Sequence, residues 1–580
     1  MLDVTAFAAL IKRKRGEARL TQETLAQDVF GDSARKADIS RLENAKVANP
    51  QEATVQKICT ALNISAAEME PIRQSRLSAA QLDQIPTLSR KDLQTLAAMF
   101  EIVGAFDMGD EELRGYLEDK ANEYRALRQQ IATMDDTITE IAQLKDAAED
   151  AAKALDFAEV EKLLASADFA ETAINAQTKI TRANNALIRN RTEQAFDILA
   201  AVADSFRSSD PMAPAQIRLQ LEDILYSHGL RYGSDGMALS ERMIRDALAD
   251  LPKEETPQLW ADAQNSLAVA LANQGTRTDG PKGADLLAEA VTACRAVLDV
   301  YTQHDYPEQW ATTLNNLGNA LQEQGSRTDG LKGADLLAEA VSAYRAALEV
   351  FTRQDHPVQW ATTQNNLGNA LRGQGIRTDG LKGADLLAQA VTAFRAALEV
   401  RTRQDHPVQW ATTQNNLGGA LRNQGTRTDG PKGTDLLAQA VTAYRAALDV
   451  YTRQDHPVDW AMTQNNLGNA LGDQGNRTNG PKGANLLAQA VTAYRAALEV
   501  RTRQDHPVQW ATTQLNIALT QRDLSRHDSC PDPHAALEAA LVAVDDALTV
   551  YDPDHMSYDH GTATRLRDAI LADIAALPPE

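Results

Sequence analysis

The segment TRQDHPVQWATTQNNLG, which runs from Thr352 to Gly368, occurs again letter for letter from Thr402 to Gly418. All six tryptophans of the 580-residue chain follow the same fifty-residue spacing, at Trp260, Trp310, Trp360, Trp410, Trp460 and Trp510. Self-similarity at a constant period of about 20–50 residues is typical of solenoids and other repeat proteins. The sequence therefore predicts a tandem array that dominates the chain.

Each unit of this array predicts two helices. Apolar residues recur at helical spacing in residues 310–321, which indicates a first helix. We expect a Gly-rich loop at residues 325–333 and a second helix from Asp335 to about Thr352. His356-Pro357 then interrupts the chain before the next tryptophan, because a proline cannot sit in a helix interior.

The large and small packing residues of each unit resemble the tetratricopeptide repeat. The residues that carry the resemblance are Leu317, Gly318, Leu321, Ala340, Tyr344 and Ala347. The resemblance implies an all-α chain with a tetratricopeptide-like α-solenoid, although these units are longer than the usual repeat of about 34 residues. The NNLG text followed by His-Pro is also similar to the repeats of kinesin light chains and of bacterial tetratricopeptide proteins associated with CHAT domains.

A polar stripe lies opposite the packing face of each first helix. Asparagines three and four residues apart are neighbours on a helix, and a carboxamide can both donate and accept hydrogen bonds to a peptide backbone. In tetratricopeptide arrays these positions line the concave groove, so we expect them to bind a peptide or protein. The alternative is that they link adjacent repeats. The residues are Asn315, Asn316, Asn319, Asn365, Asn366, Asn369, Asn415, Asn416, Asn465, Asn466 and Asn469.

The sequence favours a non-enzymatic protein without a cofactor or metal. Its histidines include His356, His406, His456 and His506, one before a proline in each of four units, which is a structural placement. Neither HExxH nor Gly-x-Ser-x-Gly occurs, and the glycine-rich loops lack the context of a phosphate-binding loop. Three widely spaced cysteines predict no disulfide framework, which is typical of the cytoplasm. No apolar run is long enough to span a membrane.

The charge of the chain is unevenly distributed. The formal net charge is −22, but residues 1–65 hold ten Lys and Arg against eight Asp and Glu. Because the remainder is strongly acidic and would repel DNA, any nucleic-acid contact is expected in this first segment.

The N-terminal segment resembles the Cro/repressor (XRE) helix-turn-helix family. The match is carried by Leu20 to Ala26 and by Ile39 to Asn44. The second helix of this motif enters the major groove of DNA. The resemblance therefore implies contacts with bases or phosphates, and the turn at residues 30–34 is longer than the family's usual text. The implied DNA-binding residues are Gln22, Ser33, Arg35, Lys36, Ser40 and Arg41.

A heptad pattern follows in residues 117–141, where apolar residues alternate at the spacing of a coiled coil. A parallel dimer formed there would bring two N-terminal domains together, as a two-fold symmetric operator requires. The alternative is an intramolecular helical hairpin that packs on residues 157–164.

These patterns predict five segments. They are an XRE-type helix-turn-helix at 1–70, a helical linker with a coiled coil at 76–178, degenerate repeats at 179–258, tandem fifty-residue repeats at 259–525 and a helical cap at 526–580. The first functional hypothesis is a bacterial DNA-binding regulator, a homodimer or higher oligomer, whose solenoid senses a peptide or protein. The second is a non-catalytic interaction scaffold or self-assembling protein, for example in stress or phage defence.

Overall fold

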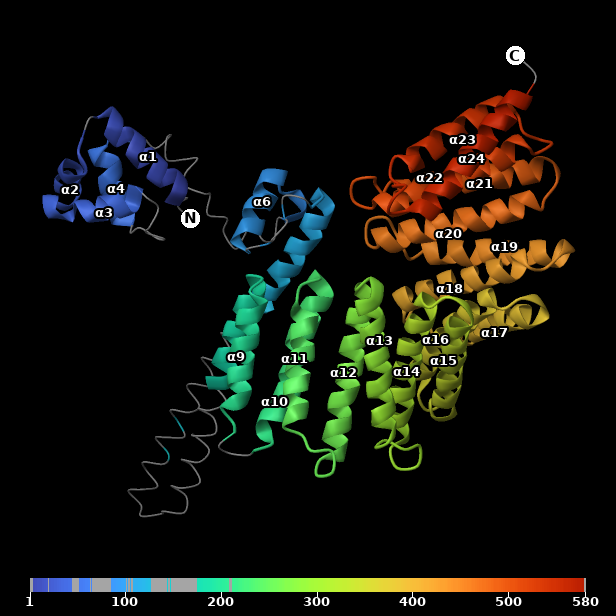
Figure 1. The fold of residues 1–580 in the computed structure, drawn as a ribbon, viewed down its shortest axis with the longest axis horizontal. Helices are drawn as coiled ribbons and strands as arrows, with labels where there is room; N and C mark the ends of the chain where they lie inside the picture. The colour runs from blue at the N-terminus through green and yellow to red at the C-terminus, as the bar shows by residue number, and fades with distance from the viewer. Residues whose placement is uncertain are drawn as a thin grey trace. The chain divides into compact units, whose positions relative to one another are not determined.

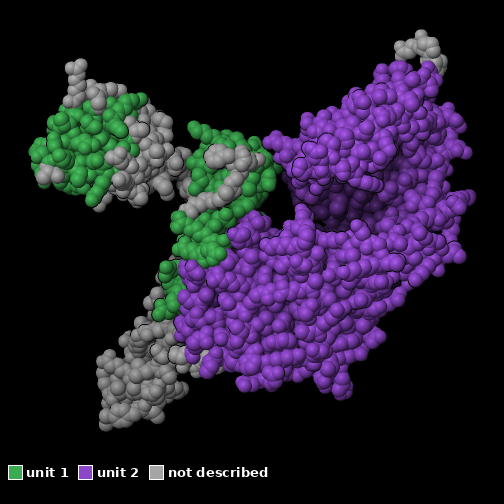
Figure 2. Space-filling view, in the orientation of Figure 1, with its two compact units in different colours: residues 1–195 green, residues 196–580 purple. Residues whose placement is uncertain are grey.

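The computed structural model describes residues 4–18, 20–43, 52–62, 85–100, 108–126, 175–207 and 211–577, together with positions 64, 102, 105, 143 and 147. Every regular element among these residues is a helix. The chain divides into two compact units, Met1–Ala195 and Phe196–Glu580 (Figure 2). None of the described helices is long and apolar enough to cross a membrane.

The second unit is a tandem series of helical hairpins, so the prediction of an all-α solenoid is confirmed (Figure 1). After α9 (Thr192–Asp204), each hairpin pairs a first and a second helix. The bounds are α10 (Ala213–Tyr232), α11 (Gly236–Ala249), α12 (Pro257–Arg277), α13 (Gly280–Leu298), α14 (Pro307–Arg327), α15 (Gly330–Val350), α16 (Pro357–Arg377), α17 (Gly380–Leu398), α18 (Pro407–Thr426), α19 (Gly430–Leu448), α20 (Pro457–Asn476), α21 (Gly480–Leu498), α22 (Pro507–Ser525), α23 (Pro533–Leu548) and α24 (Ser557–Ala576).

The repeated TRQDHP text forms the turn between hairpins. The hydroxyl of Thr352 donates to the carboxylate of Asp355 at 2.7 Å and accepts from its backbone N–H at 3.1 Å. Pro357 then opens α16, where the first backbone N–H would have no partner within the helix, so a proline loses no hydrogen bond there. The expected interruption at His356-Pro357 is therefore a helix start.

The expected Gly-rich loop at residues 325–333 is wrong, because nearly all of it is helical. α14 continues to Arg327 and α15 already begins at Gly330, not at Asp335, so only two residues connect them. Gly330 makes the turn with a φ of 66°. At Gly333 an added Cβ would lie 1.9 Å from the backbone oxygen of Thr328. Some of these glycines therefore serve close helix approach instead of an open loop.

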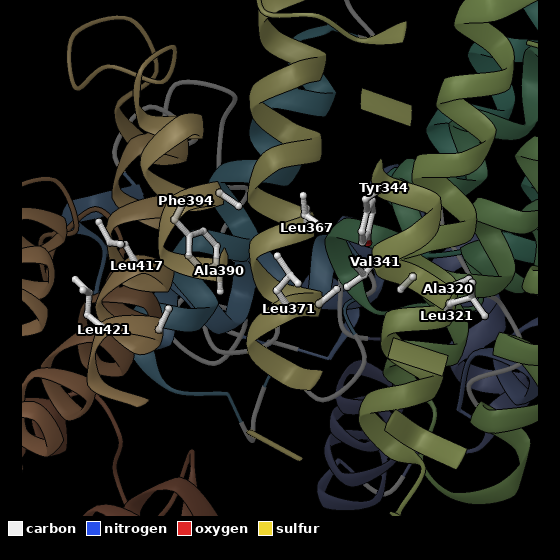
Figure 3. Close-up of a cluster of buried hydrophobic side chains, with 14 of the residues drawn as sticks. Ala320, Leu321, Val341, Tyr344, Leu367, Leu371, Ala390, Phe394, Leu417 and Leu421 are labelled. Atoms are coloured by element: carbon white, nitrogen blue, oxygen red, sulfur yellow. The ribbon is translucent and has the colours of Figure 1, made fainter. Parts of the chain in front are cut away.

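The predicted packing residues form a continuous core. Tyr344 is fully buried, and an added Cβ at Gly318 would lie 2.6 Å from its ring. Ala340 and Ala347, one turn before and after Tyr344, are also fully buried. Figure 3 shows the equivalent residues of successive hairpins, including Leu371 and Phe394, gathered between the helices. In these hairpins, a glycine on the first helix thus contacts an aromatic ring on the second helix.

Arginines join each hairpin to the one before it. The guanidinium of Arg427 donates to the backbone oxygens of Gly375, Ile376 and Thr378 at 2.5–2.9 Å. These oxygens lie at the end of α16, where helix carbonyls have no partner within the helix. Arg327, two repeats earlier, and Arg477, one repeat later, make the equivalent contacts, and Arg377 keeps one of them, to the backbone oxygen of Ser326 at 2.8 Å. The repeat therefore includes a bond that only the following repeat can complete.

The first unit contains a small helical cluster near its N-terminus. Its elements are α1 (Val4–Glu17), α2 (Gln22–Phe30), the 3-10 turn η1 (Ser33–Arg35), α3 (Lys36–Glu43) and α4 (Glu52–Ala61). The hydroxyl of Thr21 caps α2 by accepting from Thr24 N–H at 3.1 Å, as its position before the helix predicts. Phe7, Ile11 and Ile39 are among the buried residues that hold these helices together.

A second cluster of the first unit involves η3 (Ile85–Thr87), α6 (Arg90–Met99) and the helical residues 110–126. Leu117, the first position of the heptad pattern, is fully buried within this cluster. The ammonium of Lys120 is also buried and donates to the backbone oxygen of Leu187 at 2.9 Å. The heptad positions after Tyr124, and residues 157–164, lie outside the described residues.

The glycine contacts generate a stability prediction. Gly383→Ala places its Cβ 1.9 Å from the backbone oxygen of Thr378, so we expect a loss of about 1–3 kcal/mol from overpacking. In the matched control Gly373→Ala, the nearest atoms are side-chain carbons of Leu337 at 3.4 Å. Because alanine favours a helix, that control should gain about 0.5–1 kcal/mol. Urea unfolding followed by circular dichroism measures both, and equal midpoints would contradict the close approach.

Candidate functional site

The asparagines of the first helices form a hydrogen-bonded series across the hairpins, here called the Asn ladder. In each step the carboxamide nitrogen of one asparagine donates to an asparagine oxygen of the preceding hairpin. The bonds are Asn316 to Asn265 at 3.0 Å, Asn366 to Asn315 at 3.3 Å and to Asn319 at 3.1 Å, Asn416 to Asn365 at 3.3 Å, Asn466 to Asn415 at 3.2 Å and Asn516 to Asn465 at 3.2 Å.

The accepting asparagines are mostly buried inside the array. Asn365, Asn415 and Asn465 are only 7–9% exposed. The threonine of the next hairpin adds another contact, as between Thr463 and Asn415 at 3.4 Å. The geometry therefore places these asparagines between repeats, which is the alternative that the sequence left open. The donating residues Asn316, Asn366, Asn416 and Asn466 are half-buried.

The third asparagine of the stripe differs between units. Asn319 is exposed and accepts a hydrogen bond from the hydroxyl of Tyr344 at 2.7 Å. In the last full unit, Asn469 accepts from Tyr494 at 2.9 Å. Asn369 is half-buried and is paired in register with Phe394, which has no hydroxyl to donate. The corresponding position in the next unit is Gly419, so one step of this pattern is missing.

A cavity of about 350 Å³ lies on the first helices at this irregular position and is called the Gly419 pocket below. Three of the predicted groove residues, Asn415, Asn416 and Asn466, line it together. The other lining residues are Arg372, Val408, Thr412, Gly419, Arg422, Asn423, Tyr444, Tyr451, Asp459 and Met462. The surface of the second unit also shows a deep hollow in Figure 2.

The most distinctive side chains of the Gly419 pocket, Tyr444 and Arg372, are not among the residues predicted from the sequence. Burial raises the pKa of Tyr444 to about 12, so its hydroxyl stays protonated. Burial lowers the pKa of Arg372 from its ordinary value, because its guanidinium loses water. The available signal was the change from NNLGN to NNLGG at Gly419.

The predicted DNA-binding residues lie on α2, η1 and α3. Several of their basic side chains are paired with neighbouring carboxylates. Lys36 bonds Glu23 at 2.7 Å. Arg35 bonds Asp38 at 2.8 Å and covers the ring of Phe30, and Arg41 lies 4.0 Å from the same aspartate. Phosphate binding would have to compete with these carboxylates.

The other predicted residues, Gln22, Ser33 and Ser40, include two with hydrogen bonds inside the N-terminal helices. Gln22 donates to Glu43 at 2.7 Å, and Glu43 is held in addition by Arg15 at 2.5 Å. Ser33 is exposed in η1, with its backbone N–H bonded to Gln27, whereas Ser40 is half-buried in α3. The Arg15–Glu43 pair, which the sequence did not reveal, ties α1 to α3.

No group of three metal-ligating side chains gathers anywhere in the described ranges. Cys294 is buried, and burial raises its pKa to about 12, so its sulfur is a poor nucleophile at neutral pH.

Comparison with known proteins identifies one repeat unit. A sequence profile described as "Tetratricopeptide repeat" matches residues 310–358. The matched stretch covers α14, α15 and the turn that follows them, so this unit is similar to a tetratricopeptide repeat. A search of curated proteins finds no matching relative.

Two solved structures show a distant likeness. The first is described as a circular tandem repeat protein with novel repeat topology and enhanced subunit contact surfaces; it is 13% identical, with a TM-score of 0.26, and covers 76% of this chain and 97% of its own. The second is the tetratricopeptide domain of P58(IPK), 13% identical with a TM-score of 0.19, covering 74% of this chain and 99% of its own.

The Asn ladder generates a second stability prediction. Asn415→Ala removes the acceptor for Asn466 and Thr463, so we expect a loss of about 1–3 kcal/mol from unsatisfied buried groups. Asn369→Ala is the matched control: it is half-buried in an equivalent helix and makes no hydrogen bond through its side chain with any described residue. Urea midpoints compare the two variants. If Asn369→Ala costs as much as Asn415→Ala, the ladder does not stabilise the array.

The Arg15–Glu43 pair predicts a pH dependence. Burial opposes ionisation of Glu43, but hydrogen bonds from Arg15 and Gln22 outweigh it and hold the pKa of this carboxyl below its ordinary value. The stabilisation is therefore present above a pH of about 4.3, the ordinary value for glutamate, and is lost as the pH falls through the lower folded value.

Hydrogen-exchange protection factors of α1–α4 in the full chain, measured between about pH 3 and 6, test this expectation. Protection should fall with acid in the native protein and be lower and flatter in Glu43→Gln. Glu23→Gln, which removes the exposed pair with Lys36, is the control and should change little. The same acid response in Glu43→Gln would exclude Glu43 as its source.

Proposed function

We propose that this chain is a non-catalytic protein-interaction scaffold whose solenoid binds an extended segment of a partner protein on the first-helix face. The observation that carries the proposal is the Gly419 pocket, because half-buried carboxamides and unpaired polar groups converge there in a cavity of ligand-binding size. The tetratricopeptide match at residues 310–358 supports the same function.

The chemistry of this face suits a peptide backbone. Asn416 and Asn466 use their nitrogens within the Asn ladder, which leaves carboxamide oxygens to accept from a ligand. Val408 and Met462 supply apolar contact at the same pocket. An extended segment can therefore be held through its main chain and through one or two side chains.

A DNA-binding regulator is the second candidate, favoured by the exposure of Arg35, Lys36 and Arg41 beside the turn of the N-terminal helices. This candidate adds DNA as a partner to the same protein-binding solenoid. It also requires the carboxylates of Glu23 and Asp38 to release these basic groups. Homodimerisation through the heptad segment belongs to this second candidate.

A peptide-display selection against the full chain tests the scaffold proposal. We expect a library of random peptides with free C-termini to yield sequences that bind the native protein. The double variant Asn416→Ala, Asn466→Ala should weaken this binding at least about 10-fold, equivalent to about 1.4 kcal/mol. Gln439→Ala, an exposed polar residue on the second helix α19, is the control.

Circular dichroism of the double variant must show an intact helical fold for the comparison to hold. No enrichment of peptides, or equal binding by the double variant and the control, would contradict the scaffold proposal. A parallel salt titration with duplex DNA separates the second candidate. Specific binding that is lost in Arg35→Ala and Lys36→Ala would support a regulator.

A further inference from the structure

The strict repetition of the array fails at two neighbouring positions of one unit. At the first, Gly419 stands where the neighbouring units have Asn369 and Asn469. At the second, Asn423 stands where the next two units have aspartates, Asp473 and Asp523. Both substitutions remove a polar partner that other repeats possess, and both residues line the Gly419 pocket.

The first substitution leaves a tyrosine hydroxyl without a partner. Tyr344 and Tyr494 donate to Asn319 and Asn469 at 2.7 and 2.9 Å. Tyr444 occupies the same position, but Gly419 offers no side chain to accept from it. The described part of the chain provides no other hydrogen bond to this hydroxyl, although the residue is only 2% exposed.

The second substitution leaves an arginine without a carboxylate. Arg422 bonds Asp473 through Nε at 2.6 Å, and Arg522 bonds Asp573 in the same way at 2.7 Å. The aspartate in each pair lies fifty-one residues after the arginine, and for Arg372 that position is Asn423. The Nε of Arg372 is buried and has no hydrogen-bond partner, and no ion pair reaches its guanidinium within the described ranges.

The two unpaired groups lie side by side. A Cβ added at Gly419 would be 2.9 Å from Nη1 of Arg372 and 3.6 Å from the hydroxyl oxygen of Tyr444. Both groups are hydrogen-bond donors, and Arg372 also carries a positive charge. Buried donors in native proteins are almost always satisfied, so an unsatisfied adjacent pair beside a cavity indicates a missing acceptor.

We propose that the Gly419 pocket binds one carboxylate group of the partner peptide, seated on the guanidinium of Arg372 and accepting from the hydroxyl of Tyr444. This inference rests on the proposed peptide-binding function and specifies its ligand. A carboxylate matches the planar donor edge of an arginine and supplies the charge that Asp473 and Asp573 supply elsewhere.

The other charges of the pocket limit the ligand to a single anionic group. Arg422 is already neutralised by Asp473, so Arg372 is the lining cation that lacks a carboxylate. Asp459 adds a negative charge near Tyr451, on the side of the first turn of α20. A second anionic group near that side would be repelled, which disfavours polyanions.

A ligand-free measurement tests whether the guanidinium can receive a carboxylate. Asn423→Asp places the missing acid at the position that Asp473 occupies in the next unit. We expect it to raise the urea midpoint in the native background and not in the background of Arg372→Met. Gln439→Glu adds the same charge on the exposed face of α19, where it pairs with Arg395, so any small shift of the midpoint should be equal in the native and Arg372→Met backgrounds. An absent or Arg372-independent shift for Asn423→Asp would overturn the inference.

The selected peptides provide the binding test on the full chain. In each peptide, the Asp and Glu residues are replaced one at a time by Asn and Gln. A further version carries a C-terminal amide in place of the free C-terminus. We expect removal of one carboxylate to weaken binding at least about 10-fold in the native protein. Which replacement has this effect distinguishes a side-chain carboxylate from the C-terminus.

The pocket variants then locate that carboxylate. In Arg372→Met, Gly419→Asn and Asn423→Asp the same replacement should change binding less than about 2-fold, while Gln439→Glu retains the full preference. Peptides that bind equally well without any carboxylate, or a preference that persists in all three variants, would overturn the inference and leave the scaffold proposal intact. Failure of every peptide to bind would instead remove both.

Discussion

The structure depends on the close approach of two helices at glycines that have no room for a side chain. Tyr344 lies against Gly318, Phe394 against Gly368 and Tyr494 against Gly468, with 2.5–2.7 Å between an added Cβ and the ring. A second contact at the helix corner, such as Gly333 against the oxygen of Thr328, leaves no space for any larger residue. Because interiors are close-packed, these contacts set how each hairpin closes and therefore where its outer faces lie.

Near-identical hairpins stacked in this way repeat every contact between neighbours. Arg427 can reach the carbonyls of the previous helix corner, and Asn416 can reach Asn365, only because each hairpin presents the same groups to the next. Stability in such an array is approximately a sum of hairpin terms and nearest-neighbour interface terms. A substitution in one unit therefore affects only that hairpin and its neighbours. Gly419 and Asn423 can line a pocket while the surrounding hairpins keep their packing.

The N-terminal helices are not held together by repeated contacts. They have a small core of their own, and carboxylates form ion pairs with their basic residues. The buried Glu43 is the most consequential of these, because Arg15 and Gln22 both converge on it from other elements. The exposed pairs of Arg35 and Lys36 contribute little to stability. They nevertheless determine which charges are available on this surface.

Much of the fold was determined by the sequence itself. The fifty-residue period, the apolar spacing and the proline at each first helix predict tandem helical hairpins, because these signals act between residues three or four positions apart. The glycines of the hairpin corner predict a loop, but the structure is helical there, because the sequence does not distinguish a glycine needed for close packing from one needed for flexibility. Only the tertiary structure decided which asparagines are buried and which polar groups lack partners. The bonds of Asn365, Arg422 and Tyr344 join residues 25–51 positions apart, and such pairings exist only once whole helices are packed.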